Sequence, residues 1–418
     1  MPDDTPAPMS APDQPAIDPA TRAELDALLA QLQAARARKI GFPDASDFDY
    51  RDLAPFLGYL LNNLGDPDTD GGYPWHTKPL EREVLTTVAD LLRAPAHDRW
   101  GYVTSGATEG TEYALWQARR RYPDAIVYTS AAAHHATASV IDRLDMTSVT
   151  IRTDHLGEID YTDLAAQLDR HRAWPAVIVA NVGTALSEAV DDVRRIRQIL
   201  DNLAVRRRWV HCDAALSGLP LALMEPDERP GFDFADGADS IIISGHKFLG
   251  SPVPSGVVVV RASLREHGRS ATYTGAPDST VNNSRSGLAA LVWWYALRRH
   301  GVDGLRARAE QAREVAAHLH GRLVAVGWHG VHRYPHACTV TLAAPPPAVA
   351  ERWSLPIEGG RGHVVAVPGV TREMTDAFLA DLLAEPVDIP DPPLSVVDAP
   401  RPPRGMGSLR ALARADTR

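Results

Sequence analysis

The chain has 418 residues, of which 44% are apolar and 23% charged, a composition typical of a globular protein with more than one ordinary core. The net charge of -10 argues against a nucleic-acid-binding surface. The two cysteines, Cys212 and Cys338, provide neither a disulfide framework nor the spacing of a metal site. No apolar run is long enough to span a membrane, and the N-terminus lacks the order of a signal peptide. We therefore expect a cytoplasmic enzyme that binds no nucleic acid, membrane or metal.

The N-terminal region divides into three parts. Residues 1–19 hold six prolines and almost no large apolar side chains, so we expect them to be disordered. Residues 20–38 are predicted to form an amphipathic helix, because leucines recur there at helical spacing. These leucines are Leu25, Leu28, Leu29 and Leu32. Residues 39–79 are rich in Gly, Pro, Asn and Asp, which predicts irregular structure, and we group residues 20–79 together.

A large domain is predicted over residues 80–300, because helical and strand patterns alternate from about residue 80 to 262. The predicted helices are residues 81–92, 108–121, 136–144, 161–170 and 193–202. The predicted strands are residues 101–104, 125–128, 149–151, 176–180, 209–212, 240–243 and 256–260. Apolar strands that alternate with helices are typical of a mostly parallel sheet covered on both faces, which is an α/β fold.

The C-terminal part is predicted to be a smaller α+β domain over residues 301–385. Residues 287–323 are strongly helical and are expected to lead into it. Its predicted elements are strands at 339–342 and 363–367 and a helix at 371–383. The last segment, residues 386–418, holds seven prolines by residue 403, so we expect a flexible tail.

Two residues suggest the chemistry. Lys247 follows the apolar strand 240–243, and Asp213, 34 residues earlier, follows strand 209–212. This pairing suggests a pyridoxal 5'-phosphate (PLP) site. The lysine would form a Schiff base with the cofactor aldehyde, and the carboxylate would keep the pyridine nitrogen protonated so that the ring accepts electrons. Either residue alone says little, because most lysines are solvated and an aspartate after a strand is commonly a turn or cap residue.

A candidate phosphate-binding loop lies between the predicted strand 101–104 and the helix that follows it. Its residues are Ser105, Gly106, Ala107 and Thr108. Small residues there let backbone N–H groups close on a phosphate, and a helix N-terminus favours an anion. The alternative is an ordinary strand-to-helix turn. The presence of Lys247 and Asp213 favours the phosphate-binding loop over this alternative. Ser244 and His246, beside Lys247, are expected to add phosphate contacts, with an ordinary surface or core histidine as the alternative for His246.

Three more residues follow predicted strands at the edge where a doubly wound sheet binds ligands. His134 is placed to stack on a flat cofactor ring, although His135 is an alternative. Thr184 is placed to hydrogen-bond a ring substituent, and a solvated loop residue is an equal alternative. The small side chain of Ala215 would let the ring lie close to the backbone, with a plain buried alanine as the alternative.

With these residues in place, the chain resembles the group II PLP-dependent amino-acid decarboxylases. Within that family it is most similar to bacterial PLP-type histidine decarboxylases and plant serine decarboxylases. The resemblance runs from about Gly41 to about Leu383 and is strongest at residues 211–218 and 244–250. It also covers residues 41–43, 48–50, 62–67, 78–84, 100–104, 353–355 and 363–365. It implies PLP fold type I (aspartate-aminotransferase-like), with a mostly parallel central sheet in a large domain and a small α+β C-terminal domain.

The resemblance also implies roles for the candidate residues. Lys247 would be the Schiff-base lysine, Asp213 the pyridinium partner and His134 the stacking histidine, while Ala215 would support the other face of the ring. The phosphate contacts would come from Ala107, Thr108, Ser244 and His246. Tyr273 falls in a segment where related decarboxylases use a mobile loop to finish the reaction. A homodimer with active sites at the subunit interface is implied as well.

The activity implied is α-decarboxylation of an L-amino acid, with L-histidine to histamine as the first expectation. Serine, a valine-like aliphatic, an aromatic or a noncanonical amino acid remain open as substrates, because this chain departs from the family pattern at several positions. These positions are Ala107, His135, Asn283, Ser286, Leu288 and Gly369. The proton that returns to the α-carbon is expected from Lys247, Tyr273 or a histidine.

Two other functions compete with decarboxylation. An aminotransferase or lyase would use the same cofactor, and an aminotransferase normally needs an arginine to clamp the α-carboxylate, for which Arg285 and Arg361 are the candidates. An inactive binding subunit is disfavoured because Lys247, Asp213 and His134 are all present.

Overall fold

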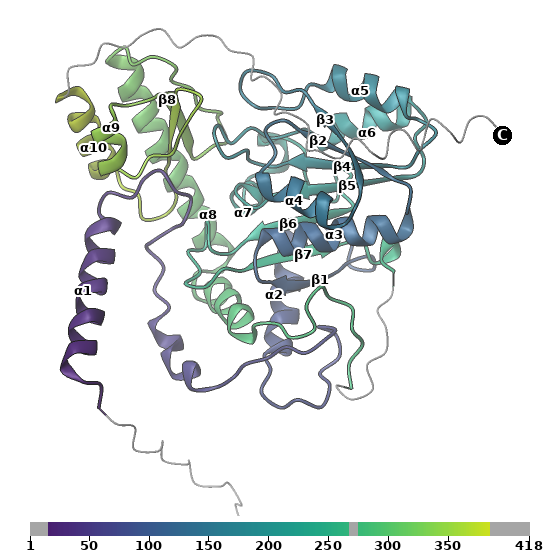
Figure 1. Ribbon diagram of the computed structural model, residues 1–418, viewed down its shortest axis with the longest axis horizontal. Coiled ribbons are helices and arrows are strands. Elements are labelled where there is room, and N and C mark those ends of the chain that lie inside the picture. Colours follow the sequence, from purple (N-terminus) through teal and green to yellow (C-terminus); the bar gives the residue numbers. More distant parts are fainter. Residues whose placement is uncertain (1–15, 267–274, 385–418) are drawn as a thin grey trace, which may run out of the picture. The chain divides into compact units, whose positions relative to one another are not determined.

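The main sheet is mostly parallel and matches the predicted strands closely. In the computed structural model, which describes residues 16–266 and 275–384, seven strands pair in the order β1-β7-β6-β5-β4-β2-β3 (Figure 1). They are β1 (Trp100–Thr104), β2 (Ile126–Ser130), β3 (Thr147–Ile151), β4 (Ala176–Asn181), β5 (Arg208–Asp213), β6 (Ser240–Ser244) and β7 (Gly256–Val260). Strand β7 is antiparallel to both β1 and β6, and the other described pairs are parallel. Strand β1 therefore runs in the same direction as β6.

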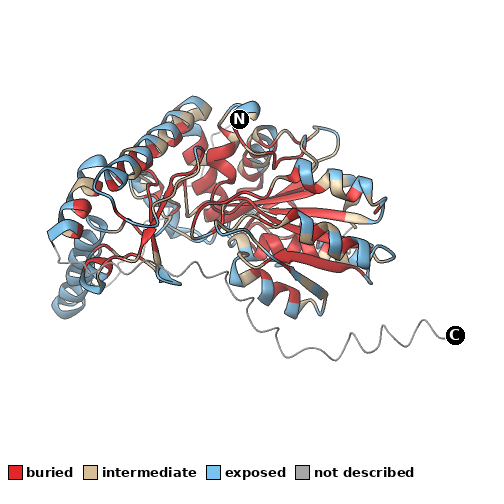
Figure 2. Ribbon diagram, turned by 90° about the horizontal axis from the view of Figure 1, so that it is seen from above, coloured by how far each residue is buried: buried red, intermediate tan, exposed pale blue. Residues whose placement is uncertain are grey.

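Helices cover both faces of this sheet, which explains why inner strands such as β4, β6 and β7 are buried along their whole length, whereas the edge strand β3 is only partly buried. The helices of the large part are α2 (Lys78–Leu91), α3 (Ala107–Arg121), α4 (His135–Arg143), α5 (Tyr161–Arg170), α6 (Val193–Asn202), α7 (Gly218–Ala222) and the start of α8 (Gly287–Ala325). Val177 and Val179 pack with α3 and α4 on one face. Ile178, between them, packs with α2, α5, α6 and α8 on the other. Figure 2 shows buried strands between helices whose outer sides are exposed.

A second, antiparallel sheet forms the C-terminal part. Its described strands are β8 (Thr339–Ala343), β9 (Ile357–Glu358) and β10 (Arg361–Val365), in the order β8-β10-β9. Helices α9 (Pro347–Arg352), α10 (Arg372–Ala384) and the end of α8 share its apolar core. Helix α8 is interrupted at Gly301, whose φ of 63° is not helical. The predicted domain boundary between residues 300 and 301 falls at this break, and the domain limits themselves stay predictions. The two sheets confirm the predicted α/β architecture with a small α+β part.

The N-terminal segment differs from the prediction in detail. Helix α2 begins at Lys78, three residues before the predicted start, because Pro79 fits the first turn of a helix. The predicted irregular segment contains a 3-10 helix, η1 (Arg51–Gly58).

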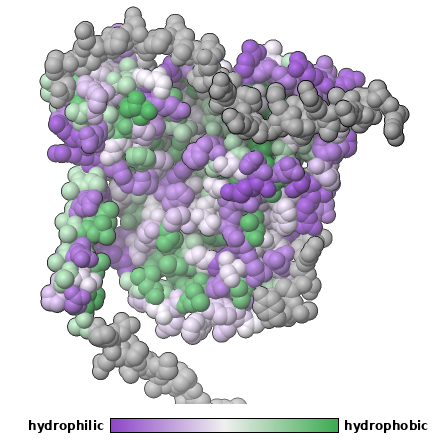
Figure 3. Space-filling view, viewed as in Figure 1, coloured by the Kyte–Doolittle hydropathy of each residue, from purple (hydrophilic) through white to green (hydrophobic). Residues whose placement is uncertain are grey.

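Helix α1 (Pro19–Arg36) forms where an amphipathic helix was predicted. The Asp18 side chain caps it by accepting hydrogen bonds from the amides of Ala20 and Thr21. Its four leucines, Leu25, Leu28, Leu29 and Leu32, are 46–58% exposed. Figure 3 shows the resulting hydrophobic surface along this helix. The predicted flexible tail and most of the predicted disordered N-terminus lie outside the described residues.

Candidate functional site

The predicted site residues meet at the edge of the main sheet where the parallel strands end. Residues 105–108 follow β1, His134 follows β2, Thr184 follows β4, Asp213 ends β5, and Ser244, His246 and Lys247 end or follow β6. The strand register aligns these ends, because Asn181 pairs with Asp213, and Thr104 and Ser244 both pair with Gly256. This edge is where ligands bind in open α/β sheets. Tyr273 lies outside the described residues.

The Lys247 amine lies in a partly buried setting with carboxylates nearby. Burial lowers its pKa, and the charges of Asp213 and Glu188 act in the opposite direction. The backbone carbonyl of Lys247 accepts a hydrogen bond from the amide of Ala45 at 2.9 Å. A lysine amine with a lowered pKa is more often neutral near pH 7, which is the form that attacks an aldehyde.

The sequence offers few other lysines for this role. Only Lys39, Lys78 and Lys247 occur in the chain. The amine of Lys78 donates hydrogen bonds to the backbone carbonyls of Thr69 and Asp70 and is therefore engaged elsewhere.

His134 interacts with the groups at this edge. It forms the N-cap of α4, where its Nδ1 accepts a hydrogen bond from the Ala136 amide at 3.2 Å, so the ring proton sits on Nε2. Burial and the neighbouring His135 ring lower the pKa of His134, the Asp213 charge raises it and the Lys247 charge lowers it. The rings of His134 and His135 lie 4.1 Å apart between centroids.

The start of α3 leaves backbone N–H groups available. No side chain among the described residues caps this helix, and Gly106 holds the N-cap with a φ of 153° that favours glycine. The hydroxyl of Ser105 donates to the carboxylate of Glu109 at 2.7 Å, so its proton is already engaged. The amides of Ala107 and Thr108 are the better candidates for an anion.

Ser244, at the end of β6, provides an observation that favours a ligand. Its side chain is buried, and its Oγ has no hydrogen-bond partner within residues 16–266 and 275–384. A buried hydroxyl without a partner is costly, and a phosphate oxygen would satisfy it. Together with the Lys247 amine and the uncapped start of α3, this orphaned hydroxyl shows that the residues present fit PLP.

Other predicted cofactor contacts are engaged within the protein. The Thr184 hydroxyl accepts a hydrogen bond from the Ala189 amide at 3.1 Å and lies 3.0 Å from the Ser187 hydroxyl. The His246 ring is held by the backbone of Ser255 through Nδ1. Both residues lie at the right edge, but a contact with the cofactor would need a rearrangement of Thr184 or would use Nε2 of His246.

Ala215 is buried beside Asp213. Its amide donates to Oδ1 of Asp213 at 3.2 Å, which orients the carboxylate.

Sequence reasoning missed the contacts that hold the Lys247 loop from a distance. Besides the Ala45 amide, the Tyr50 hydroxyl donates to the carbonyl of Leu249 at 2.5 Å. The Ser46 amide donates to the Pro368 carbonyl at 3.0 Å, which ties the same segment to the small part. Residues 41–50 therefore form a strap between the two parts. Their only signal in the sequence was their similarity to the family, which indicated no role.

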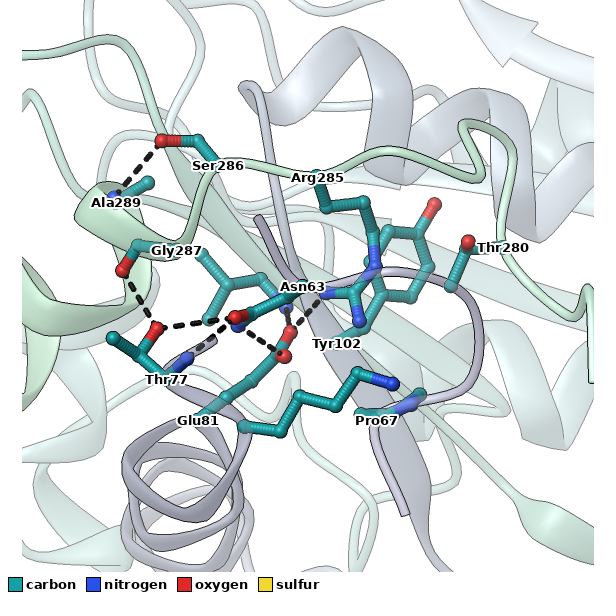
Figure 4. Close-up of polar contacts among 12 residues, drawn as sticks. Asn63, Pro67, Thr77, Glu81, Tyr102, Thr280, Arg285, Ser286, Gly287 and Ala289 are labelled. Carbon is teal, nitrogen blue, oxygen red and sulfur yellow. Dashed lines mark hydrogen bonds and ion pairs between the residues drawn. The ribbon is translucent and has the colours of Figure 1, made fainter. Parts of the chain in front are cut away.

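Arg285, a candidate carboxylate clamp, is committed to a buried ion pair. Its guanidinium pairs with Glu81 and donates to the Gly65 carbonyl at 2.9 Å, and it lies 5.3 Å from the centre of the Tyr102 ring. Figure 4 shows Arg285 pointing at Glu81, which also accepts a hydrogen bond from Asn63 at 2.9 Å. The ion pair is structural, so Arg285 is not available to hold a substrate carboxylate.

The second clamp candidate is engaged as well, since Nη1 of Arg361 donates to the His155 carbonyl at 3.1 Å. In the part of the chain that the structure describes, no cluster of three or more metal-ligating side chains occurs. No helix in that part is both long and apolar enough to cross a bilayer.

Known proteins are similar to this chain over most of its length. Residues 69–329 match the family described as the pyridoxal-dependent decarboxylase conserved domain. The histidine decarboxylase of Mesorhizobium japonicum is 38% identical over 364 residues, which cover 87% of this chain and 98% of that protein. Serine decarboxylase 3 of Oryza sativa subsp. japonica is 35% identical over 350 residues, covering 82% and 77%.

Solved structures have the same architecture. L-methionine decarboxylase from Streptomyces sp. 590 superimposes with a TM-score of 0.81 at 27% identity, covering 90% of this chain and 97% of that one. This similarity confirms the predicted fold type I.

Replacement of Glu81 by Gln is expected to destabilise the protein by about 3–5 kcal/mol, because it leaves the Arg285 guanidinium buried without its counter-charge. Urea denaturation followed by circular dichroism measures the loss. The matched control is Glu83→Gln on the same helix, where the ion pair with Arg298 is exposed and the change should be small. Equal stability of the two variants would contradict the structural role of the Arg285 pair.

Proposed function

Because this chain belongs to the pyridoxal-dependent decarboxylase family and is therefore a PLP-dependent carboxy-lyase, we propose that its substrate is L-histidine and its products histamine and carbon dioxide. The observation that carries the chemistry is the meeting of Lys247 and Asp213 at one edge of the sheet. Similarity to several histidine decarboxylases over most of their length supports the substrate. L-Serine is the second candidate, because serine decarboxylases are almost as similar.

Each site residue has a proposed role in holding PLP. Lys247 bonds to the cofactor aldehyde, and Asp213 pairs with the pyridine nitrogen. His134 stacks on the ring, and Ala215 lies against its other face. The phosphate is held by Ser244, by the amides of Ala107 and Thr108, and by further contacts from Ser105, Gly106 and His246. Thr184 hydrogen-bonds a substituent of the ring. When bound, PLP supplies a ring that withdraws electrons from the α-carbon of the substrate.

The residues around the site favour loss of the carboxylate over transamination. With Arg285 paired to Glu81 and Arg361 engaged by His155, neither arginine holds the α-carboxylate, which a decarboxylase must release. The Asp213 charge stabilises positive charge on the pyridine nitrogen. The lowered pKa of Lys247 lets its amine exchange with the amine of the substrate and then hold a proton near the α-carbon. A histidine and Tyr273 are alternative proton donors.

We also propose a homodimer with sites at the subunit interface. Outside α1, a group of large apolar side chains is exposed on residues 56–60 and at Trp75. Such a group is expected on a surface that another chain covers. These residues are Phe56, Leu57, Tyr59, Leu60 and Trp75, and the exposed fraction reaches 71% at Leu57. The rings of Tyr59 and Trp75 lie 6.1 Å apart between centroids, so the two parts of this surface are continuous.

The state of the two cysteines supports a proposed cytoplasmic location. Cys212 and Cys338 are both buried as free thiols, which suits a reducing compartment.

The proposed activity predicts that the purified protein with PLP converts L-histidine to histamine, detected by mass spectrometry together with released carbon dioxide. Every other L-amino acid should give less amine, and Lys247→Ala should abolish the product. Ethanolamine from L-serine as the main product would replace the proposed substrate while keeping the reaction. Formation of a keto acid without carbon dioxide would contradict decarboxylation itself.

The proposed stacking role predicts that His134→Ala weakens PLP binding by about fivefold, since an aromatic stack contributes about 1 kcal/mol. His134→Phe should restore most of the affinity because it keeps a flat ring. Quenching of tryptophan fluorescence by PLP measures the dissociation constant. The control is His135→Ala, and a larger loss of affinity in the control than in His134→Ala would assign the stacking to His135.

The dimer proposal predicts a particle with twice the mass of one chain by light scattering. The double variant Leu57→Lys, Leu60→Lys should shift this particle toward the monomer, because it places charges on the exposed apolar surface. Leu383→Lys, at another exposed leucine, is the control. A wild-type monomer at micromolar concentration would refute the proposal.

A further inference from the structure

Glu188 is a buried carboxylate with an unusual backbone conformation, and the chemistry described above does not use it. Its side chain is almost inaccessible, with an exposed fraction of 2%, and its φ of 58° lies in the left-handed region that favours glycine. Such a conformation persists at a non-glycine residue when surrounding contacts hold it in place. The hydrogen bonds of the Glu188 side chain identify the segments that it connects.

The carboxylate joins three segments. One oxygen accepts a hydrogen bond from the Ser217 hydroxyl at 2.8 Å. The other accepts from the amides of Cys338 and Thr339, each at 2.8 Å, at the start of β8. Ser217 lies four residues beyond Asp213, so one side chain links the small sheet to the segment that carries Asp213.

The loop that contains Glu188 is closed on itself. The Glu188 amide donates to the carbonyl of Thr184 at 2.9 Å, and the Ala189 amide donates to the Thr184 hydroxyl at 3.1 Å. At Gly183, in the same loop, a side chain would collide with the Ser217 hydroxyl, since a Cβ there would lie 2.1 Å from it. Glu188 therefore belongs to a hydrogen-bonded loop at the edge where the cofactor is expected.

Glu188 also acts on the Lys247 amine. The charges that raise the pKa of Lys247 against the effect of burial come from Asp213 and then from Glu188. His134 and His246 also interact with the charge of Lys247, which lowers the pKa of both rings. Asp213 is thus not the sole anion that influences this amine.

The remaining ionisable groups around Glu188 belong to the segment before β8. They are Arg333, His336 and Cys338. Burial raises the pKa of Glu188, while the hydrogen bonds from Thr339 and Ser217 lower it.

We propose that Glu188 is a positioning residue that ties the loop after β4 to the small sheet and to the segment that carries Asp213, and that its negative charge acts on the Lys247 amine. The inference rests on Lys247 as the proposed cofactor lysine. Unlike hydrogen bonds that only hold the loop in place, the charge of Glu188 changes the protonation of the Lys247 amine. A negative charge stabilises the ammonium form, so its removal lowers the pH at which the Lys247 amine becomes neutral.

The test measures how fast added PLP bonds to the cofactor-free full chain, followed by visible absorbance from pH 6 to pH 10. The rate should rise with pH to a midpoint set by the Lys247 amine. In Glu188→Gln, which keeps the shape of the side chain, the midpoint should fall by about one unit. Below both midpoints this variant should therefore bond PLP about ten times faster than the wild type, because it has more neutral amine.

Two further variants at the same position separate charge from structure. Glu188→Gly suits the left-handed backbone and removes the same charge, so it should show the same lower midpoint even if the glutamine variant folds poorly. Glu188→Asp keeps the charge and should leave the midpoint close to that of the wild type.

The matched control is Asp239→Asn. Asp239 is a buried carboxylate paired with Arg197, and it lies just before β6, at the opposite end of that strand from Lys247. Its replacement should not move the midpoint. An unchanged midpoint in Glu188→Gln and Glu188→Gly would overturn the inference, as would slower bonding at every pH. Detection of PLP on a residue other than Lys247 would instead show that the proposed site is wrong.

Discussion

The alignment of the strand ends is the constraint on which the site depends. Asn181 and Asp213 pair in register on β4 and β5, and Ser244 ends β6 on the next strand. Parallel strands place their carboxyl ends at one edge, so residues far apart in sequence meet there without any direct pairing of their side chains. Because β7 is reversed, it begins at this edge, where Gly256 pairs with both Thr104 at the end of β1 and Ser244 at the end of β6. The cofactor loop before α3 is thereby brought to the same place.

This edge is then held from the outside. The strap of residues 41–50 bonds to the backbone of Lys247 and Leu249, and Glu188 bonds to the start of β8. Both connections reach the small part of the fold. The two parts therefore share hydrogen bonds at the residues nearest the proposed chemistry, and a change in their relative position would act directly on Lys247.

The elements were predictable because their signals are local. Apolar runs such as Ile241–Ile243 mark strands buried on both faces, and the ends of these strands mark the site. Helices α5 and α6 begin at the predicted residues because an aspartate caps the N-terminus of each, Asp160 and Asp192.

The unpredicted features depend on contacts between distant residues. Nothing near Glu188 in the sequence indicates that Cys338 and Thr339 will donate to it. Likewise, the pairing of Arg285 with Glu81 spans 204 residues, so a candidate substrate clamp could not be recognised as structural before the fold was known. The strap, Glu188 and the ion pair are products of tertiary packing, whereas the roles proposed for Lys247, Asp213 and His134 came from strand ends and family resemblance.

The central claim is that this edge of the sheet binds PLP through Lys247. Borohydride reduction of the PLP-loaded protein, followed by peptide mass spectrometry, tests it most directly, because only three lysines occur in the chain. The account predicts a pyridoxyl group on the peptide that contains Lys247 and none on Lys39 or Lys78. A pyridoxyl group on Lys78, or on no lysine after loading, would contradict it.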